Sequence, residues 1–318
     1  MRKLASIAVF GALLVSISAC STPVSTFAAC DAEGSADLVS ADGAFGADPE
    51  ATFPTPLVSS EPAISEIIHG DGDSVPRGGV VDGTISIYLG ETGEALVNGG
   101  PITALPIMLP TSDFLFPFTD ALQCATDGSR VVTTGTAEDL FGTESAANLQ
   151  LDPETPLVVV TDVTASYLGR ANGVDQLAQP GMPAIVLAPS GQPGFTFPDA
   201  DAPTDLRIAV LKQGSGATVT KGDSVVLQYS GILWGADELF DSSWKNNGTP
   251  VVLTAESLED SPSGGIVPGF ATALIGQKVG SQVLAVIPPE FGYPAGSAPE
   301  SIPEGSTMVF VFDVLGIQ

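Results

Sequence analysis

The sequence has little positive charge, and this shortage argues against two classes of partner. Its 318 residues include 10 Lys and Arg against 37 Asp and Glu, which gives a formal net charge of −27. The phosphate backbone of a nucleic acid and an anionic lipid surface both repel such a chain. We therefore expect no nucleic-acid binding and no electrostatic docking on membranes. The alternative explanation for the acidity is that it only keeps the surface soluble.

Histidine is almost absent, which limits the available chemistry. His69 is the single histidine, and it lies beside a turn rich in Gly and Asp. A Ser–His or Cys–His nucleophilic pair is therefore hard to build. The adjacent stretch Asp71-Gly72-Asp73-Ser74 has the first residues of a calcium-binding loop. It lacks the later ligands and the bidentate Glu, so a plain turn is the better interpretation. We expect no metal and no cofactor.

Apolar residues, glycine and proline are plentiful. Hydrophobic residues make up 44% of the chain and its mean hydropathy is +0.31, which is enough apolar material for real cores. Its 36 Gly and 26 Pro favour turns and short strands over long helices. At about 150 residues per domain, the chain has room for two ordinary domains and a tail.

The N-terminus carries the pattern of an export signal. Arg2 and Lys3 precede an almost unbroken apolar stretch over residues 4–15, which is too short to span a bilayer. It is followed by Ile17-Ser18-Ala19-Cys20. This tetrapeptide resembles the lipobox of bacterial lipoproteins. The resemblance implies that residues 1–19 are a signal peptide, that Cys20 is lipidated, and that the protein is anchored outside the cytoplasm. An ordinary signal peptide cleaved nearby is the alternative.

Two cysteines remain after Cys20 is assigned to lipidation. In an exported protein, Cys30 and Cys124 are expected to form one disulfide that ties the N-terminal tail to the first domain. Two unpaired thiols are the alternative.

Composition divides the rest of the chain. Residues 20–60 are rich in Ala, Ser, Asp, Glu and Pro without periodicity, which predicts an acidic flexible tether. Residues 171–204 contain six prolines and predict a linker, in which the apolar run Ala184-Ile185-Val186-Leu187 indicates that part packs on a domain. The flanking segments, 61–170 and 205–318, are the predicted domains.

These two segments resemble each other. Phe118-Thr-Asp-Ala121-Leu122 aligns with Phe270-Ala-Thr-Ala273-Leu274, and residues 157–163 align with residues 308–314. Upstream, residues 84–90 align with residues 224–231 if one residue is added, which pairs Tyr88 with Tyr229. Several blocks in the same order predict two copies of one fold.

The second copy is predicted to consist mostly of strands. Residues 206–211, 224–233, 282–287 and 307–315 are the predicted strands, and residues 269–276 form one short helix with apolar residues at helical spacing. A twisted antiparallel sheet wrapped on one short helix is a compact α+β fold.

Several blocks in residues 205–318 occur in a fixed order. They are Val225-Val226-Leu227-Gln228-Tyr229-Ser230-Gly231, Leu239-Phe240-Asp241-Ser242-Ser243, Ile266-Val267-Pro268-Gly269-Phe270, Ile287-Pro288-Pro289-Glu290-Phe291-Gly292-Tyr293 and Val309-Phe310-Val311-Phe312-Asp313. Together they resemble the FKBP-type peptidyl-prolyl cis/trans isomerases. The resemblance implies two FKBP-like domains, the second of which is an isomerase.

The resemblance also implies an apolar pocket. Its catalytic residues are Tyr229, Phe240, Asp241, Val267, Phe270 and Tyr293, and its substrate-binding residues are Val251, Ile266, Ile302 and Phe310. Phe270 would be the floor for the proline ring, the Val267 N–H and the Tyr293 hydroxyl would donate to substrate carbonyls, and Asp241 would act as the acceptor. Rotation about an amide breaks no covalent bond, so no nucleophile is needed. Taken singly, each Phe could be an ordinary core residue.

The two copies depart from the family pattern to different degrees. The second has Phe270 where the family usually has Trp, Val251 where an aromatic is common, and no arginine after Ser243, so Asp241 either loses a partner or uses Lys245. The first has Glu91-Thr-Gly-Glu-Ala-Leu96 and Asp113-Phe-Leu-Phe-Pro117-Phe118 in place of pocket blocks. We expect it to have lost the pocket and to serve as a spacer or client-binding module.

The leading hypothesis is a prolyl isomerase that assists folding of exported proteins at the outer face of the cell membrane. Its partners would be unfolded or exported polypeptides that contain proline. A non-catalytic FKBP-like chaperone or scaffold is the alternative, and would predict erosion in both copies. A solute-binding lipoprotein would predict larger domains of alternating strands and helices, which the sequence lacks.

Overall fold

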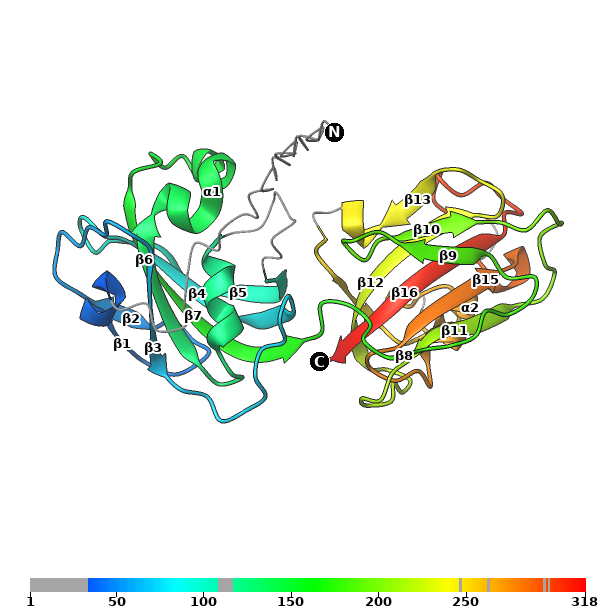
Figure 1. Cartoon of the computed structure of the whole chain (residues 1–318), viewed down its shortest axis with the longest axis horizontal. Helices are drawn as coiled ribbons and strands as arrows, with labels where there is room; N and C mark the ends of the chain where they lie inside the picture. Colours follow the sequence, from blue (N-terminus) through cyan, green and yellow to red (C-terminus); the bar gives the residue numbers. More distant parts are fainter. Residues whose placement is uncertain (1–33, 108–116, 246–247, 262–263, 294–295, 297) are drawn as a thin grey trace, which may run out of the picture.

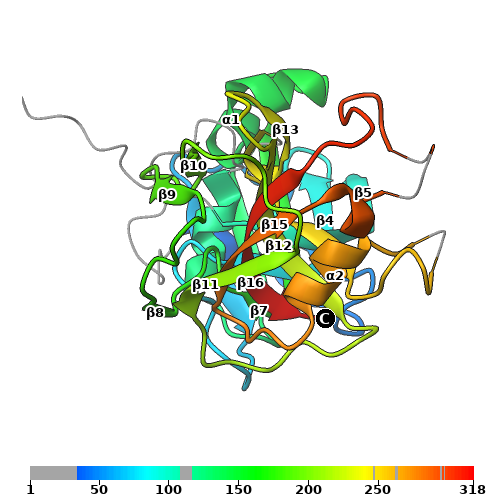
Figure 2. The ribbon, with the colours of Figure 1, turned by 90° about the vertical axis from the view of Figure 1, so that its right-hand side faces the viewer.

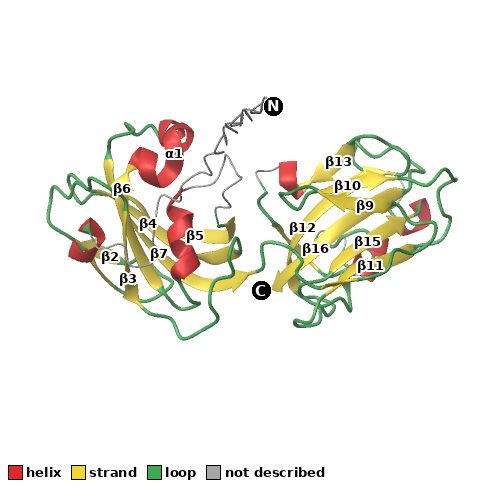
Figure 3. Ribbon diagram, viewed as in Figure 1, coloured by secondary structure: helices red, strands yellow, loops and turns green. Residues whose placement is uncertain are grey.

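The computed structural model describes residues 34–107, 117–245, 248–261, 264–293, 296 and 298–318. Two antiparallel sheets lie side by side along the long axis, one in each half of the chain (Figures 1 and 3). The predicted signal peptide and both Cys20 and Cys30 lie outside the described residues. Within the described part, no helix has the length and apolar character needed to cross a membrane.

The first domain is built on a five-stranded sheet in the order β3-β6-β7-β4-β5. Its strands are β3 (Ala63–Ile68), β4 (Val80–Leu89), β5 (Ala95–Pro106), β6 (Arg130–Thr136) and β7 (Pro156–Tyr167). The N-terminal part adds η1 (Ser35–Leu38), β1 (Ser40–Asp42) and β2 (Glu50–Thr52), and the helices are η2 (Pro117–Cys124) and α1 (Ala137–Asn148).

The second domain has a seven-stranded sheet in the order β13-β12-β16-β15-β11-β8, with β14 also paired to β12. Its strands are β8 (Val174–Asp175), β11 (Arg207–Gln213), β12 (Ser224–Leu233), β13 (Leu239–Ser242), β14 (Val251–Thr254), β15 (Gln282–Ile287) and β16 (Met308–Ile317). β9 (Ala184–Leu187) and β10 (Pro193–Thr196) form a separate hairpin, and the helices are η3 (Ser243–Lys245), α2 (Pro268–Leu274) and η4 (Pro289–Phe291). The fold is α+β, as predicted.

The apolar runs of the sequence explain the centre of this sheet. β15 is buried along its whole length and β16 along all but its last residue, so both strands read as continuous apolar runs rather than as alternating ones. α2 begins at Pro268, whose fixed φ suits the first turn of a helix. Its buried side includes Phe270, Ala273 and Leu274, and it packs against β15, on the far side of the sheet from the β9–β10 hairpin (Figure 2).

The strand registers support an internal duplication. Arg130 of β6 faces Asp162 of β7, as Gln282 of β15 faces Asp313 of β16. The hairpins extend the match beyond the aligned blocks. Ser40 faces Thr52 in β1–β2, and Ala184 faces Thr196 in β9–β10 with the same spacing. Each copy therefore contains a hairpin, which precedes β3 in the first copy and β11 in the second, and each hairpin lies on the outer face of its own sheet.

The first hairpin changes the interpretation of the N-terminal region. Ala36, Val39 and Leu57 are buried in a cluster with Tyr88 and Val160 of the sheet. Residues 35–60 therefore belong to the folded first domain, which differs from the flexible tether predicted for residues 20–60. No hydrophobic periodicity marks this region, because its strands have only three residues each.

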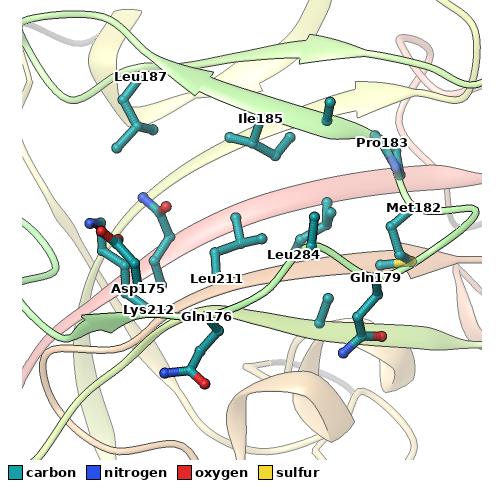
Figure 4. A pocket seen from close by; sticks show the side chains of 14 residues that line it. Asp175, Gln176, Gln179, Met182, Pro183, Ile185, Leu187, Leu211, Lys212 and Leu284 are labelled. Atoms are coloured by element: carbon teal, nitrogen blue, oxygen red, sulfur yellow. Dashed lines mark hydrogen bonds and ion pairs between the residues drawn. The ribbon is translucent and has the colours of Figure 1, made fainter.

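The second hairpin occupies much of the predicted linker. Ile185 and Phe195 pack over the outer face of the sheet, and the Phe197 ring lies 5.2 Å from that of Trp234. The packing of the run at residues 184–187 was predicted. A cavity of about 420 Å³ remains between this hairpin and the sheet, with Leu211 and Leu284 on its floor (Figure 4).

The two domains contact each other directly after β7. Tyr167 and Val80 of the first domain share a cluster with Val226 and Leu315 of the second. The Leu168 N–H donates to the Leu315 carbonyl at 3.2 Å. Gly316 is required here, because a Cβ at this position would lie 2.2 Å from a ring carbon of Tyr167.

The first domain contains a helix that the sequence comparison missed. α1 follows β6, where the alignment expected a counterpart of the Pro288-Pro289 turn. The Thr136 hydroxyl accepts from the Asp139 N–H, and the Asp139 carboxylate accepts from the Thr136 N–H. This reciprocal cap is the signal that the sequence offered.

Candidate active site

The ten pocket residues predicted from the sequence come from six parts of the second domain. β12 supplies Tyr229, β13 supplies Phe240 and Asp241, and β16 supplies Phe310. The remaining residues are Val251 of β14, Phe270 of α2 with Ile266 and Val267 before it, and Tyr293 and Ile302 from the loops that follow η4. All the apolar and aromatic members lie in a single core cluster, so the structure brings them together.

Phe310 lies at the centre of the aromatic side chains. Its ring is perpendicular to that of Phe270 at 5.0 Å and to that of Phe240 at 5.5 Å, measured between centroids. The Tyr229 ring lies 6.4 Å from it on another side. Edge-to-face pairs at these distances are favourable beyond the area they bury. They fix the aromatic side chains of this cluster relative to one another beside the buried side of α2.

The polar part of the pocket is a tyrosine–aspartate pair. The Tyr229 hydroxyl donates to Asp241 Oδ2 at 2.5 Å. Burial, followed by the hydrogen bond and the charge of Asp241, raises the pKa of Tyr229 well above its ordinary value. Burial and the same carboxylate also raise the pKa of Tyr293. Both phenols are therefore protonated donors at neutral pH, beside one acceptor carboxylate.

Two buried serines hold the strand that carries Asp241. The Ser243 hydroxyl accepts from the Tyr229 N–H at 2.9 Å and donates to Gln228, and the Ser242 and Ser230 hydroxyls lie 2.8 Å apart. Lys245, which the sequence offered as a partner for Asp241, instead donates to the Leu239 carbonyl at 2.7 Å. Asp241 is bonded by Tyr229 and by the Ser242 N–H.

Two further residues shape the pocket. Phe312 is fully buried and stacks beneath Phe270 at 4.7 Å, so it supports the floor. Gly231 lies opposite Phe310, and a Cβ there would come within 2.6 Å of the Phe240 ring and 2.7 Å of the Phe310 ring. A glycine inside a strand signals such a close approach. The sequence comparison included both residues in its blocks but gave them no role.

The first domain does not use Tyr88 in the way the alignment implied. β7 residues 157–163 match β16 residues 308–314, and Tyr88 faces Val158 whereas Tyr229 faces Phe312. In this register Ile85, which faces Thr161, occupies the place of Tyr229. Tyr88 lies on the outer face, where its hydroxyl donates to the Pro49 carbonyl.

An apolar groove remains at the corresponding place in the first domain. Phe118, the counterpart of Phe270, is buried and lies 5.4 Å from the ring of Phe141. A cavity of about 490 Å³ beside them is bounded by β4, β5 and α1. The first copy thus lacks the polar pair of the isomerase site, and an apolar hollow with a different lining lies beside Phe118.

The described residues contain no cluster of three or more His, Cys, Asp and Glu side chains that could hold a metal ion. The pocket instead offers an aromatic floor, two hydroxyl donors and one carboxylate. Cys124 is disulfide-bonded. Cys30, its predicted partner, falls outside the described part of the chain.

Known proteins resemble the second domain. Residues 216–315 match the family described as FKBP-type peptidyl-prolyl cis-trans isomerase. An FK506-binding protein of Streptomyces anulatus is 30% identical over 127 residues, which are 40% of this chain and 97% of that protein. A protein of Corynebacterium glutamicum named "Probable FK506-binding protein" is 34% identical over 126 residues, 39% of this chain and 97% of the relative.

Among solved structures, FkpA from Escherichia coli is 26% identical, with 44% of this chain and 53% of that chain covered and a TM-score of 0.32. The family match begins after β11 and includes β12 to β15, most of β16, α2 and the aromatic cluster of the second domain. The chain belongs to the FKBP-type peptidyl-prolyl cis-trans isomerase family.

Proposed function

We propose that the second domain catalyses cis/trans isomerisation of X-Pro bonds in exported polypeptides. The observation that carries the proposal is the Tyr229–Asp241 pair at the rim of the Phe240, Phe270 and Phe310 cluster. Donors, an acceptor and a dry aromatic floor are what a rotating amide requires. The family match supports the same activity.

The pocket suits this reaction for physical reasons. The planar amide is held by resonance, with a rotation barrier of about 18–20 kcal/mol for an ordinary peptide bond. X-Pro bonds cross a similar barrier in tens to hundreds of seconds without a catalyst. A twisted amide is less polar than a planar one, so aromatic walls that exclude water favour it. Tyr293, whose phenol is protonated, is the side chain we assign to the substrate carbonyl, and Phe270 is the floor for the proline ring.

The activity is tested on the full chain with a proline-containing tetrapeptide and a protease-coupled assay. Tyr229→Phe removes the hydroxyl donor and Asp241→Asn removes the carboxylate charge, both with little change of shape, and each is expected to lower kcat/KM about tenfold. Because the two residues act as one unit, the double variant should lose little more than either single variant.

Tyr88→Phe is the matched control, since it removes a tyrosine hydroxyl from the outer face of the first domain. It is expected to leave kcat/KM unchanged. A wild-type chain that is folded by circular dichroism but does not exceed the spontaneous rate would refute the proposal. The non-catalytic chaperone would then be the better account.

The location is part of the proposal and rests on the N-terminal sequence alone. The lipobox-like Ile17-Ser18-Ala19-Cys20 supports anchoring of the protein at the outer face of the cell membrane. Expression in bacteria with radiolabelled palmitate is expected to label the wild type and not Cys20→Ala. Equal labelling of both proteins would contradict lipidation at Cys20.

A further inference from the structure

We propose that the groove of the first domain is a second, non-catalytic binding site that takes an extended, uncharged apolar segment of a polypeptide. This site is separate from the isomerase pocket and does not depend on its activity. Three features of the groove support such a ligand: its position, its lining and the strand at its border.

The position of the groove follows from the duplication. Ile87 faces Val159, as Gly231 faces Phe310 in the second domain. In the second domain the bulky member of this facing pair is Phe310 of β16, whereas in the first domain Ile87 of β4 takes the place of Gly231. The hollow at this place is therefore not filled in the first domain but relined, with Phe118 kept as the buried floor.

The lining determines what the groove can bind. The residues around it are Ile85, Ile87, Pro101, Ile102, Thr103, Leu105, Phe118, Phe141, Ser145, Asn148 and Leu149. None of them is charged and none is a tyrosine. A charged ligand would lose its hydration without gaining a partner, whereas aliphatic and aromatic side chains would lose only water contacts. The cavity of about 490 Å³ is within the usual size of a ligand site.

The border of the groove points to a polypeptide rather than to a small apolar molecule. Among the described residues β5 is the edge strand of the five-stranded sheet, and it contributes Pro101, Ile102, Thr103 and Leu105 to the lining. An edge strand has a row of backbone groups without a strand partner, which an extended peptide can pair with while its side chains enter adjacent pockets. An edge strand beside an apolar hollow is the arrangement that this mode of binding uses.

The far wall of the groove is α1, which stands where the isomerase domain has only the short helix η4. Phe141 of this helix is buried against Phe118, and Leu149 at its end is 50% exposed on the rim. Leu149 offers apolar surface that a bound segment would cover. Leu96, on β5 but outside the groove, is 44% exposed and provides a matched comparison.

Binding is tested on the full chain by fluorescence anisotropy with a labelled, end-capped peptide Ser-Leu-Ile-Val-Leu-Ser. The peptide contains no proline, so the isomerase reaction plays no part. We expect saturable binding to the wild type and at least a tenfold loss of affinity for Leu149→Asp, the factor that corresponds to 1.4 kcal/mol. Leu96→Asp should bind within twofold of the wild type. Both positions are exposed, and circular dichroism checks that both variants fold.

Three outcomes would overturn the proposal. They are no saturable binding to the wild type, equal losses in Leu149→Asp and Leu96→Asp, and loss of binding in Tyr229→Phe/Asp241→Asn. The last outcome would place the peptide in the isomerase pocket. Isomerase activity measured on the same wild-type sample separates failure of this site from failure of the proposed enzyme.

Discussion

The buried ion pair between Arg130 and Asp162 holds the N-terminal hairpin on the sheet of the first domain, and a stability measurement can test this. Arg130 is 1% exposed. Its Nε donates to Asp162 Oδ1 at 2.6 Å and its Nη2 donates to Asp162 Oδ2 at 2.8 Å. Its other N–H groups reach the carbonyls of Ala41, Gly43 and Ala44 at 3.1 to 3.3 Å. One side chain therefore joins the sheet to the loop of the N-terminal hairpin.

In the second domain, the equivalent pair of residues makes fewer hydrogen bonds. Gln282 occupies the equivalent position and makes one hydrogen bond to Asp313, at 2.7 Å. Arg130→Gln is thus expected to keep one bond to Asp162 and lose the rest. Removing one partner of a buried ion pair costs about 3–5 kcal/mol. Because glutamine keeps one bond, we expect the lower end, about 3 kcal/mol, and a fall in the melting temperature of about 10 °C.

The assay can assign this loss to one domain. Both tryptophans, Trp234 and Trp244, lie in the second domain, so their fluorescence reports only that domain, whereas far-ultraviolet circular dichroism reports both. Arg130→Gln should shift a circular-dichroism transition more than the fluorescence transition. Arg77→Gln, the same substitution at an exposed arginine of the first domain, is the control. If the two variants unfold at the same midpoint, the guanidinium does not anchor the hairpin and the reasoning is wrong.

Two further predictions concern the second domain. Gly316→Ala would place a methyl group 2.2 Å from a Tyr167 ring carbon, so it should lower the free energy of unfolding by about 1–3 kcal/mol. Hydrogen exchange at the Leu168 amide should become faster, and an unchanged exchange rate would contradict the contact. Burial raises the pKa of Asp313 above its ordinary value, so the folded state holds this proton more tightly than the unfolded chain does. The wild type therefore loses stability relative to Asp313→Asn as the pH rises from about 4 through the raised pKa. Urea midpoints of both proteins between pH 4 and 7 check this, and a pH-independent difference would contradict it.

Much of the second domain could be predicted from the sequence, because its signals are local. The strands around 224–233, 282–287 and 307–315 are runs of β-branched and aromatic residues, and α2 begins at a proline. The pocket residues lie in blocks whose order is characteristic of a family. The hairpins were harder, because their strands have three or four residues and are held by distant groups such as Arg130. A domain drawn from residue 205 omits the hairpin that covers Ala209 and Leu284.

The register of β4 could not be obtained by matching residue types. The alignment placed Tyr88 on Tyr229, but the ladder places Ile85 there, three positions earlier. Side chains alternate between the two faces of a strand, so an odd shift moves a residue to the opposite face. A tyrosine that appeared to belong to the pocket therefore lies on the outer face, under the N-terminal hairpin.

The two copies differ at both residues that form the Tyr229–Asp241 hydrogen bond. Ile85 replaces Tyr229, and Val97, which faces Ile87, stands where Asp241 faces Gly231. Both members of the polar pair are apolar in the first copy. Tyr229 is half-buried and Asp241 is exposed, so a phenol at this place without its acceptor would leave a partly buried polar group unsatisfied, whereas the carboxylate would stay in contact with water. Both residues of the pair differ together between the two copies. The floor, which needs no partner, remains in both copies as Phe118 and Phe270.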